Sequence, residues 1–116
     1  MDVRIKRVYD PPDPADGTRI LVDRLWPRGV SRERAAIDDW LRDLAPSTEL
    51  RRWFSHDPAR FDEFRRRYAA ELTDRNTALD DLRRTAKKGP LTLVYSARDT
   101  EHNDAVVLAD VLRDGA

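Results

Sequence analysis

The chain contains no cysteine, and this absence excludes disulfides, thiolate catalysis and cysteine-ligated zinc or iron–sulfur sites. It also lacks an excess of charge of either sign, since 22 Lys and Arg residues balance 22 Asp and Glu residues. No whole-protein field therefore draws it to nucleic acid or to an anionic membrane. Only two histidines are present, His56 and His102. A three-ligand metal site would need carboxylates whose positions nothing in the sequence identifies, and we predict no metal site.

Long apolar runs are also missing. No stretch approaches the roughly 20 apolar residues of a membrane-spanning helix. The first ten residues, MDVRIKRVYD, lack the apolar core of a signal peptide. These absences predict a cytoplasmic protein with no membrane partner. The length of 116 residues and the lack of repeats or flexible linkers predict a single α/β domain over residues 1–116. Nothing in the sequence identifies a cofactor or an oligomeric state.

Short apolar runs indicate three strands. Residues 20–22 and 91–97 are nearly continuous apolar runs, which is typical of strands covered on both faces. A shorter β-compatible stretch with Val3, Ile5 and Val8 precedes the loop DPPDPADG, whose prolines and glycine are incompatible with a helix. This loop is short for a crossover with a helix, so the first strand is either parallel to the second or antiparallel in a hairpin-like start.

Helical patterns fill the region between the second and third runs. A first helix is predicted from the N-cap Ser31 to Pro46, with an apolar stripe of Ile37, Trp40, Leu41 and Leu44. Ser47 can cap a second, TELRRWF, and the Asp57–Pro58 pair opens a third. The third presents Phe61, Phe64, Tyr68 and Leu72 at helical spacing, and a fourth presents Leu79, Leu82 and Ala86.

A polar turn and a last helix follow the third apolar run. Asp99 or Thr100 can cap this helix, which would bury Ala105, Leu108, Val111 and Leu112. A strand, a polar turn and a helix in this order make half of a βαβ unit. The sequence therefore favours an α/β fold whose short, mostly parallel sheet is flanked by helices.

Two polar segments lie where such a sheet would place a ligand. In open parallel sheets, ligands bind beyond the carboxyl ends of the strands, where loops and helix N-termini converge. This rule selects DRLWPRG, after the second run, and SARDTEHN, before the last helix. The two segments contain the candidate ligand-binding residues Arg24, Trp26, Arg28, Ser96, Arg98, Asp99 and Asn103, and the candidate catalytic residues Asp23 and His102.

The physical case for an anion site rests on backbone amides and arginines. Free amide groups near residues 100–103 would favour a phosphate or carboxylate, with Arg98 just ahead of the cap. Arg24 or Arg28 could supply a bidentate clamp from the neighbouring strand end. Alternatively, Asp23 with Arg24 and Arg98 with Asp99 form ion pairs that tie the loops together. Trp26 is expected to form a rigid wall of its loop rather than a platform on which a base or ring of a ligand stacks.

Other chemistry is less well supported. Asp99 could orient His102, but no nucleophile-elbow sequence surrounds Ser96, which disfavours a Ser-His-Asp triad. His102 acts either as an acid or base or as a helix-end hydrogen-bonding residue. The segments LRRWF and FRRRY set arginines among aromatics, yet the aromatics have core spacing and acids lie nearby, so a nucleic-acid partner is not favoured.

Several uncommon strings occur in order along the chain: RVYDPP, DGTRILVDRLWPRGVS, LAPSTELRRWF, HDP, FRRRYAAEL and LTLVYSARDTEHNDAVVLADVL. Together, over residues 5–112, they resemble the short, YeaO-like branch of the domain-of-unknown-function 488 family. Longer members carry an aspartate and an arginine at a strand end, which Asp23 and Arg24 resemble. They also carry a Cys-His-Arg-like turn. This chain has EHND there, so His102 and Asn103 are the nearest counterparts, and any role of the missing thiol is in doubt.

The resemblance implies a small, Rossmann-like three-layer α/β fold with the two motifs adjacent, and it implies no established activity. Two functions remain open for the predicted site. The protein is an enzyme acting on a small phosphorylated or acidic metabolite, with Asp23 or His102 as the acid or base, or a non-catalytic module that binds a ligand or a protein. A nucleic-acid-associated protein is a third, weaker alternative.

Overall fold

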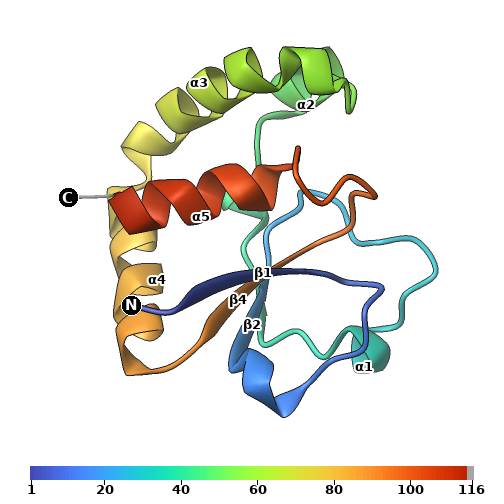
Figure 1. Cartoon of the computed structure of the whole chain (residues 1–116), viewed down its shortest axis with the longest axis vertical. Coiled ribbons are helices and arrows are strands. Elements are labelled where there is room, and N and C mark those ends of the chain that lie inside the picture. The colour runs from blue at the N-terminus through green and yellow to red at the C-terminus, as the bar shows by residue number, and fades with distance from the viewer. Residues whose placement is uncertain (115–116) are drawn as a thin grey trace.

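The computed structural model describes residues 1–114, and its centre is a sheet of four parallel strands (Figure 1). The strands are β1 (Val3–Arg7), β2 (Thr18–Leu21), β3 (Asp39–Trp40) and β4 (Leu91–Tyr95). Their order is β1-β4-β2-β3. β1 and β2 both run parallel to β4, which lies between them. The antiparallel, hairpin-like start is therefore wrong, and the chain crosses from β1 to β2 with only a short 3-10 turn, η1 (Pro14–Asp16).

Five α-helices accompany the sheet within the described residues. They are α1 (Arg32–Ala35), α2 (Thr48–Phe54), α3 (Phe61–Glu71), α4 (Asn76–Lys88) and α5 (Asp104–Asp114). Three further 3-10 turns are η2 (Arg42–Leu44), η3 (Pro58–Arg60) and η4 (Leu72–Asp74). Ser47 and Asp57 cap α2 and η3 as predicted. The α/β class, with a short parallel sheet flanked by helices, is confirmed.

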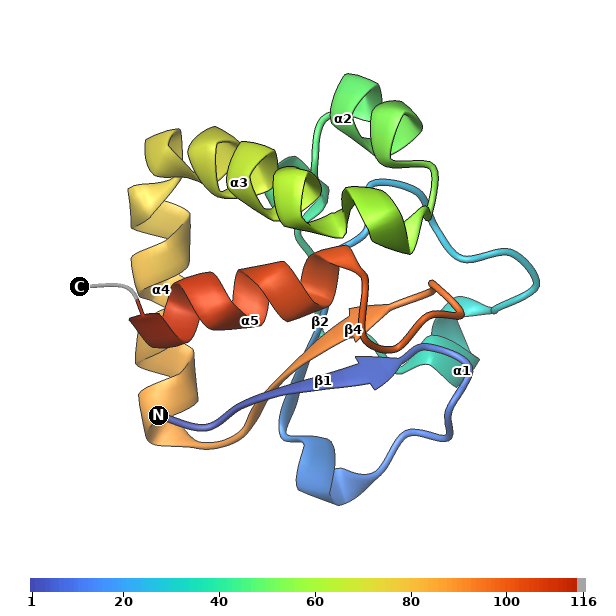
Figure 2. The same cartoon turned by 45° about the horizontal axis from the view of Figure 1, so that its top comes forward.

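One face of the sheet is apolar and covered by helices. Successive side chains of a strand point to opposite faces, and Leu91, Leu93 and Tyr95 of β4 join the main core. α5 packs directly against β1 and β4, and α3 packs on α5 (Figure 2). At the far end of α5, Arg113 donates a hydrogen bond to the Val3 carbonyl at 2.6 Å. The buried apolar residues of α2, α3, α4 and α5 thus belong to the core on this side.

The opposite face carries a buried charged network. The Asp16 carboxylate accepts hydrogen bonds from Arg19 at 2.6 Å and from Lys6 at 3.1 Å. Thr92 of β4 donates to the Asp16 carbonyl at 2.7 Å. Arg19 also donates to the carbonyls of Ala35 and Ala36, at the end of α1. All five residues of β4 are buried, which confirms that this strand is covered on both faces. On the second face, polar side chains form part of the covering layer.

The first predicted helix is wrong beyond its first turn. Ser31 caps α1 as expected, but α1 ends at Ala35 because Ala36 takes a left-handed conformation with φ of 49°. The predicted stripe residue Trp40 instead forms β3 and pairs with Leu21. Helical spacing of apolar residues is a local signal, and here pairing with the open edge of β2 outweighs it.

The cap of the last helix also differs from the prediction. Asn103, not Asp99 or Thr100, accepts a hydrogen bond from the Val106 amide at 3.0 Å in front of α5. Asp99 instead accepts from the amides of Glu101 and His102 in the preceding turn. Of the residues predicted to be buried, Val111 is only partly so. The strand-to-helix connection is therefore one turn longer than predicted.

Candidate functional site

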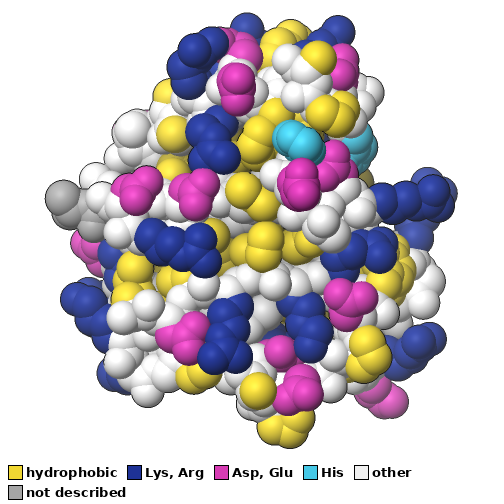
Figure 3. All heavy atoms as spheres, in the orientation of Figure 1, with side chains coloured by type: hydrophobic (Ala, Val, Ile, Leu, Met, Phe, Trp, Pro, Cys, Tyr) yellow, Lys and Arg dark blue, Asp and Glu magenta, His cyan; other side chains and the backbone are white. Residues whose placement is uncertain are grey.

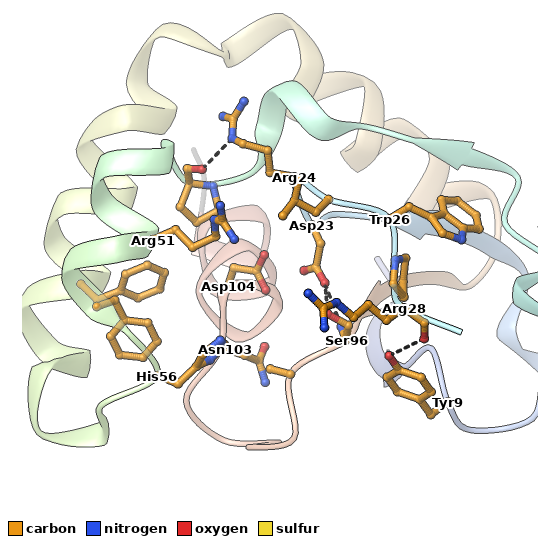
Figure 4. A pocket seen from close by; sticks show the side chains of 16 residues that line it. Tyr9, Asp23, Arg24, Trp26, Arg28, Arg51, His56, Ser96, Asn103 and Asp104 are labelled. Carbon is orange, nitrogen blue, oxygen red and sulfur yellow. Dashed lines mark hydrogen bonds between the residues drawn. The ribbon is translucent and has the colours of Figure 1, made fainter. Parts of the chain in front are cut away.

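A cavity of about 350 Å³ lies at the carboxyl ends of β2 and β4 (Figure 4). The loop after β2 forms one side of it, and the loop after β4 with the start of α5 forms its base. The α2 helix and the turn that follows close the other side. Six of the predicted site residues line it: Asp23, Arg24, Trp26, Arg28, Ser96 and Asn103. The rule that ligands bind beyond the strand ends thus selects two segments that border the same cavity.

Asp23 joins the two segments. One oxygen of its carboxylate, Oδ2, accepts from the Ser96 amide at 2.9 Å and from the Ser96 hydroxyl at 2.7 Å. Its main-chain carbonyl accepts from the indole of Trp40 at 2.7 Å. Because these bonds reach both β4 and β3, the Asp23 carboxylate is held in a fixed position at the base of the cavity.

Asp104, the first residue of α5, adds a second carboxyl to this base. Figure 4 shows the carboxyl groups of Asp23 and Asp104 pointing toward one another. Burial, and then the neighbouring Asp23 carboxyl group, raise the pKa of Asp104 well above its usual range. The charged form of Asp104 is therefore disfavoured in this setting. We refer to these two residues as the carboxyl pair.

Sequence reasoning missed Asp104. An aspartate in the first turn of a helix is ordinarily a favourable partner for the helix dipole, and that role alone accounts for its presence. The signal that could have found it is position: it directly follows SARDTEHN, the segment that the strand-end rule selects. Asp23 lies 81 positions earlier in the sequence. The two residues meet because β2 and β4 are neighbours in the sheet.

Three arginines line the cavity, each in a different setting. Arg24 turns toward Pro46 and donates to the carbonyls of Pro46 at 3.1 Å and Ala45 at 3.4 Å (Figure 4). Arg28 and Arg51 are exposed, and their side chains extend into the cavity from opposite sides (Figure 4). Arg51 comes from α2 and was not among the predicted residues. Arg24 therefore stabilises the loop, while Arg28 and Arg51 are available to a ligand.

The predicted ion pairs do not form within residues 1–114. No salt bridge there joins Asp23 to Arg24 or Arg98 to Asp99. The interpretation of these residues as ion pairs is thus wrong, although Arg24 does tie two loops through carbonyl groups.

Trp26 forms a rigid part of the wall. Its indole donates to the Val30 carbonyl at 2.7 Å, and its ring meets the Trp40 ring edge-on at a centroid distance of 5.5 Å. The Arg32 guanidinium covers the Trp26 ring at 4.6 Å from its centroid. These contacts use the indole donor and part of the ring, which agrees with a structural wall.

The second segment divides into two parts. Ser96 and Asn103 line the cavity, whereas Arg98, Asp99 and His102 do not. His102 Nδ1 lies 2.9 Å from Asp99 Oδ2, and its ring meets the Phe61 ring edge-on. Hydrogen bonds from the Glu101 and His102 amides, the former the largest effect, lower the pKa of Asp99. His102 is thereby a hydrogen-bonding residue of the turn, outside the lining of the cavity.

His56 borders the cavity from the turn after α2. Ser55 and His56 both adopt left-handed backbone conformations, with φ of 47° and 55°. Two consecutive residues of this kind without glycine are uncommon and carry a conformational cost. The turn holds the His56 ring near Phe54, with a centroid distance of 6.2 Å.

The arginine-rich segments LRRWF and FRRRY, in α2 and α3, make contacts within the protein. Trp53 lies between the guanidinium groups of Arg60 and Arg67, and Arg67 also pairs with Glu63. Phe61, Phe64 and Tyr68 of α3 are buried in the core. Figure 3 shows acidic and basic side chains interspersed on the face it presents. These segments form no uninterrupted basic surface on that face.

Two features are absent from residues 1–114. No group of three or more His, Asp or Glu side chains is arranged to hold a metal ion. No helix in this range combines the length and apolarity needed to cross a bilayer.

The fold and the cavity define a small α/β protein with a parallel sheet and a polar pocket at the strand ends. The chain belongs to the family described as the inactive DUF488-N3 subclade, whose model matches residues 2–116. It is 50% identical over 113 residues to the uncharacterized protein YeaO of Escherichia coli, covering 97% of this chain and 98% of that protein. It is 46% identical over 110 residues to the uncharacterized protein Rv3073c of Mycobacterium tuberculosis, covering 95% and 92%.

These matches confirm the family resemblance read from the sequence. No solved structure matches the chain. The Rossmann-like arrangement that the resemblance implied stays a prediction.

Proposed function

We propose that this protein is a non-catalytic binding module whose cavity binds a small anionic molecule bearing a phosphate or carboxylate group. The observation behind the proposal is the placement of Arg28 and Arg51, which enter one cavity from opposite sides (Figure 4). Guanidinium groups recognise phosphate and carboxylate oxygens through paired N–H donors.

The charge of the cavity supports an anionic ligand. Its lining includes the cations Arg24, Arg28 and Arg51 and the acids Asp23 and Asp104. The three guanidinium groups outnumber the two carboxyl groups, and burial beside Asp23 disfavours the charged form of Asp104 by raising its pKa. An anionic ligand would reduce this imbalance of charge.

Two observations favour binding over turnover. His102, the candidate acid or base of the second segment, does not line the cavity. The family to which the chain belongs is described as an inactive subclade. A binding role is consistent with both, and it needs no group that the described residues do not supply.

The test is a thermal-shift measurement with phosphate, sulfate, sugar phosphates, nucleotides and small dicarboxylates. A ligand at 100 times its dissociation constant adds about 2.7 kcal/mol. In a domain of this size that is a shift on the order of 10 °C. We expect Arg28→Ala and Arg51→Ala to remove the shift. Arg52→Ala, the neighbour of Arg51 outside the cavity lining, and Arg98→Ala are the matched controls and should retain it.

A flat response across the whole panel would refute the anion site. A shift lost in Arg98→Ala but kept in Arg28→Ala and Arg51→Ala would move the site to the turn before α5. Turnover of any stabilising ligand, followed by product analysis, would refute the non-catalytic role.

A further inference from the structure

The cavity has two chemically different ends. Arg28 and Arg51 supply cations from its sides, and the carboxyl pair Asp23–Asp104 supplies oxygen acceptors at its base (Figure 4). A simple anion such as phosphate satisfies the arginines and places negative charge toward Asp23. Part of the cavity would then face the wrong charge, so an inorganic anion alone is not its best complement.

The hydrogen-bonding inventory of the base defines what it can accept. Asp23 uses Oδ2 for the two Ser96 donors, which leaves Oδ1 with free lone pairs. Asp104 lies beside Asp23 and accepts the Ala105 amide at 2.9 Å through Oδ1. The Asn103 side chain is already occupied, since it donates to the Asp99 carbonyl and accepts from Val106. The base therefore offers acceptors and a negative charge, and it needs hydrogen donors from a ligand.

Much of the remaining lining is apolar. Phe54, Phe64, Pro46 and Ala97 belong to it. The volume of about 350 Å³ is larger than an inorganic anion needs and falls within the range of small-molecule sites. A short carbon skeleton joining two polar ends would occupy it.

We propose that the ligand is dipolar: an anionic group contacts Arg28 and Arg51, and nitrogen-bound hydrogens at the other end donate to Asp23 and Asp104. This inference rests on the proposed function and adds the second end of the ligand. The nitrogen donor comes from either of two sources, the ammonium group of an amino phosphate or amino acid, or the exocyclic amino group of a nucleotide base. Both present N–H groups to carboxylate oxygens.

An ammonium ligand has a consequence that a simple anion lacks. Its positive charge favours the ionised form of Asp104, so binding moves the Asp104 proton to the buffer. Several titratable or charged groups share the cavity with Asp104. The loop after β2 contributes Asp23, Arg24 and Arg28, and α2 with its following turn contributes Arg51 and His56. Tyr68 of α3 is also close enough to interact with Asp104. Tyr68 is buried and donates to the Leu44 carbonyl, and it keeps its proton because burial raises its pKa well above its usual range.

The experiment compares ligands that differ only in the nitrogen group. Phosphoethanolamine is paired with propyl phosphate, and 3-aminopropyl phosphate with butyl phosphate, for the ammonium source. Adenosine 5′-monophosphate is paired with purine riboside 5′-monophosphate for the base source. Affinities are measured by isothermal titration calorimetry, and each titration is repeated in two buffers of different ionisation enthalpy to count released protons.

We expect the nitrogen-bearing member of at least one pair to bind the wild type about tenfold or more tightly, the effect of a charge-assisted hydrogen bond. If the source is ammonium, its binding releases protons. Asp104→Asn should abolish that release, and Asp23→Asn should abolish the preference while retaining the alkyl phosphate. Asp110→Asn, on the same helix but outside the cavity lining, is the control and should behave as wild type.

Equal affinities within every pair would overturn the dipolar ligand while leaving the anion site intact, because the phosphate group is common to both members. Absence of binding by all six compounds and by inorganic phosphate would overturn both. The wild-type comparison needs no variant, so the inference stays testable even if Asp23→Asn fails to fold.

Discussion

Two acidic centres, one on the polar face of the sheet and one at the carboxyl ends of its strands, lie in opposite electrostatic surroundings. Asp16 is surrounded by cations, with Arg19 at 2.6 Å and Lys6 at 3.1 Å. Asp104 is surrounded by protein and by another carboxylate, Asp23. The first centre is closed and its partners are complete. The second opens into a cavity, and burial beside Asp23 disfavours the charged form of Asp104.

This difference indicates that Asp16 stabilises the fold, whereas the carboxyl pair is a candidate functional group. Burial alone would raise the pKa of Asp16, but hydrogen bonds from the Asp13 amide, Lys6 and Arg19 outweigh it and lower the pKa. Folding therefore favours the charged form of Asp16. At the carboxyl pair the charged form of Asp104 is disfavoured, and strongly perturbed groups in a cleft are candidates for a functional site.

The largest expected effect comes from breaking the closed centre. Arg19→Met leaves the buried Asp16 with Lys6 as its remaining cation and removes the hydrogen bonds to two carbonyls after α1. We expect a loss of about 3 kcal/mol in the free energy of unfolding, as for other broken buried ion pairs. Urea denaturation measures it, with the exposed Arg34→Met as the control. A loss below about 1 kcal/mol would contradict the assigned role.

The two centres should respond to pH in opposite directions. The folded-state pKa of Asp16 is lowered, so its stabilisation is present above the unfolded value near 3.8 and is lost as pH falls through the folded pKa. The folded-state pKa of Asp104 is raised, so its contribution is favourable at acidic pH and declines as pH rises from about 3.8 toward the folded pKa.

Asp104→Asn isolates the second of these effects. The amide carries no charge to bury, so we expect a gain on the order of 1 kcal/mol at pH 8 relative to wild type. The gain should shrink as the pH is lowered to 5. Unfolding free energies at the two pH values measure it, and Asp110→Asn is the matched control. A loss of stability that is equal at both pH values would instead indicate a purely structural hydrogen bond.

A smaller effect should follow from loosening Asp23. Ser96→Ala removes the hydroxyl donor at 2.7 Å but keeps the Ser96 amide donor at 2.9 Å. One side-chain hydrogen bond contributes about 1 kcal/mol, so we expect a loss of that size or less. Differential scanning calorimetry measures it, with Ser96→Thr expected to recover part of the loss. An unchanged transition in Ser96→Ala would show that the amide alone fixes Asp23.

The smallest effect is expected at His102. Its ring contacts Asp99 and Phe61 and does not line the cavity. His102→Asn should therefore change the affinity for any anionic ligand by less than about twofold, a difference below 0.5 kcal/mol. Titration calorimetry against wild type checks this. A tenfold loss would restore His102 to the binding site.

The sequence predicts the strand-end location well and the composition of the site only in part. The strands that hold Asp23 and Ser96 are continuous apolar runs, and a general rule on parallel sheets then brings their ends together. Arg51 and Asp104 could not be found this way. Arg51 reaches the cavity because α2 folds over the loop after β2, and Asp104 matters only through its distant partner. Trp40 was misassigned for the same reason, since its strand exists through pairing with β2.

The α5 helix has the carboxyl pair at one end and the clasp from Arg113 to the Val3 carbonyl at the other. It packs along β1 and β4 between these two attachments, so it behaves as a rigid rod fixed at both ends. A ligand that moves the Asp104 end of α5 toward the cavity would strain the hydrogen bond between Arg113 and the Val3 carbonyl, at the start of β1. Occupancy of the cavity would then be readable as altered hydrogen exchange of the amides at the start of β1, at the amino ends of the strands and away from the ligand.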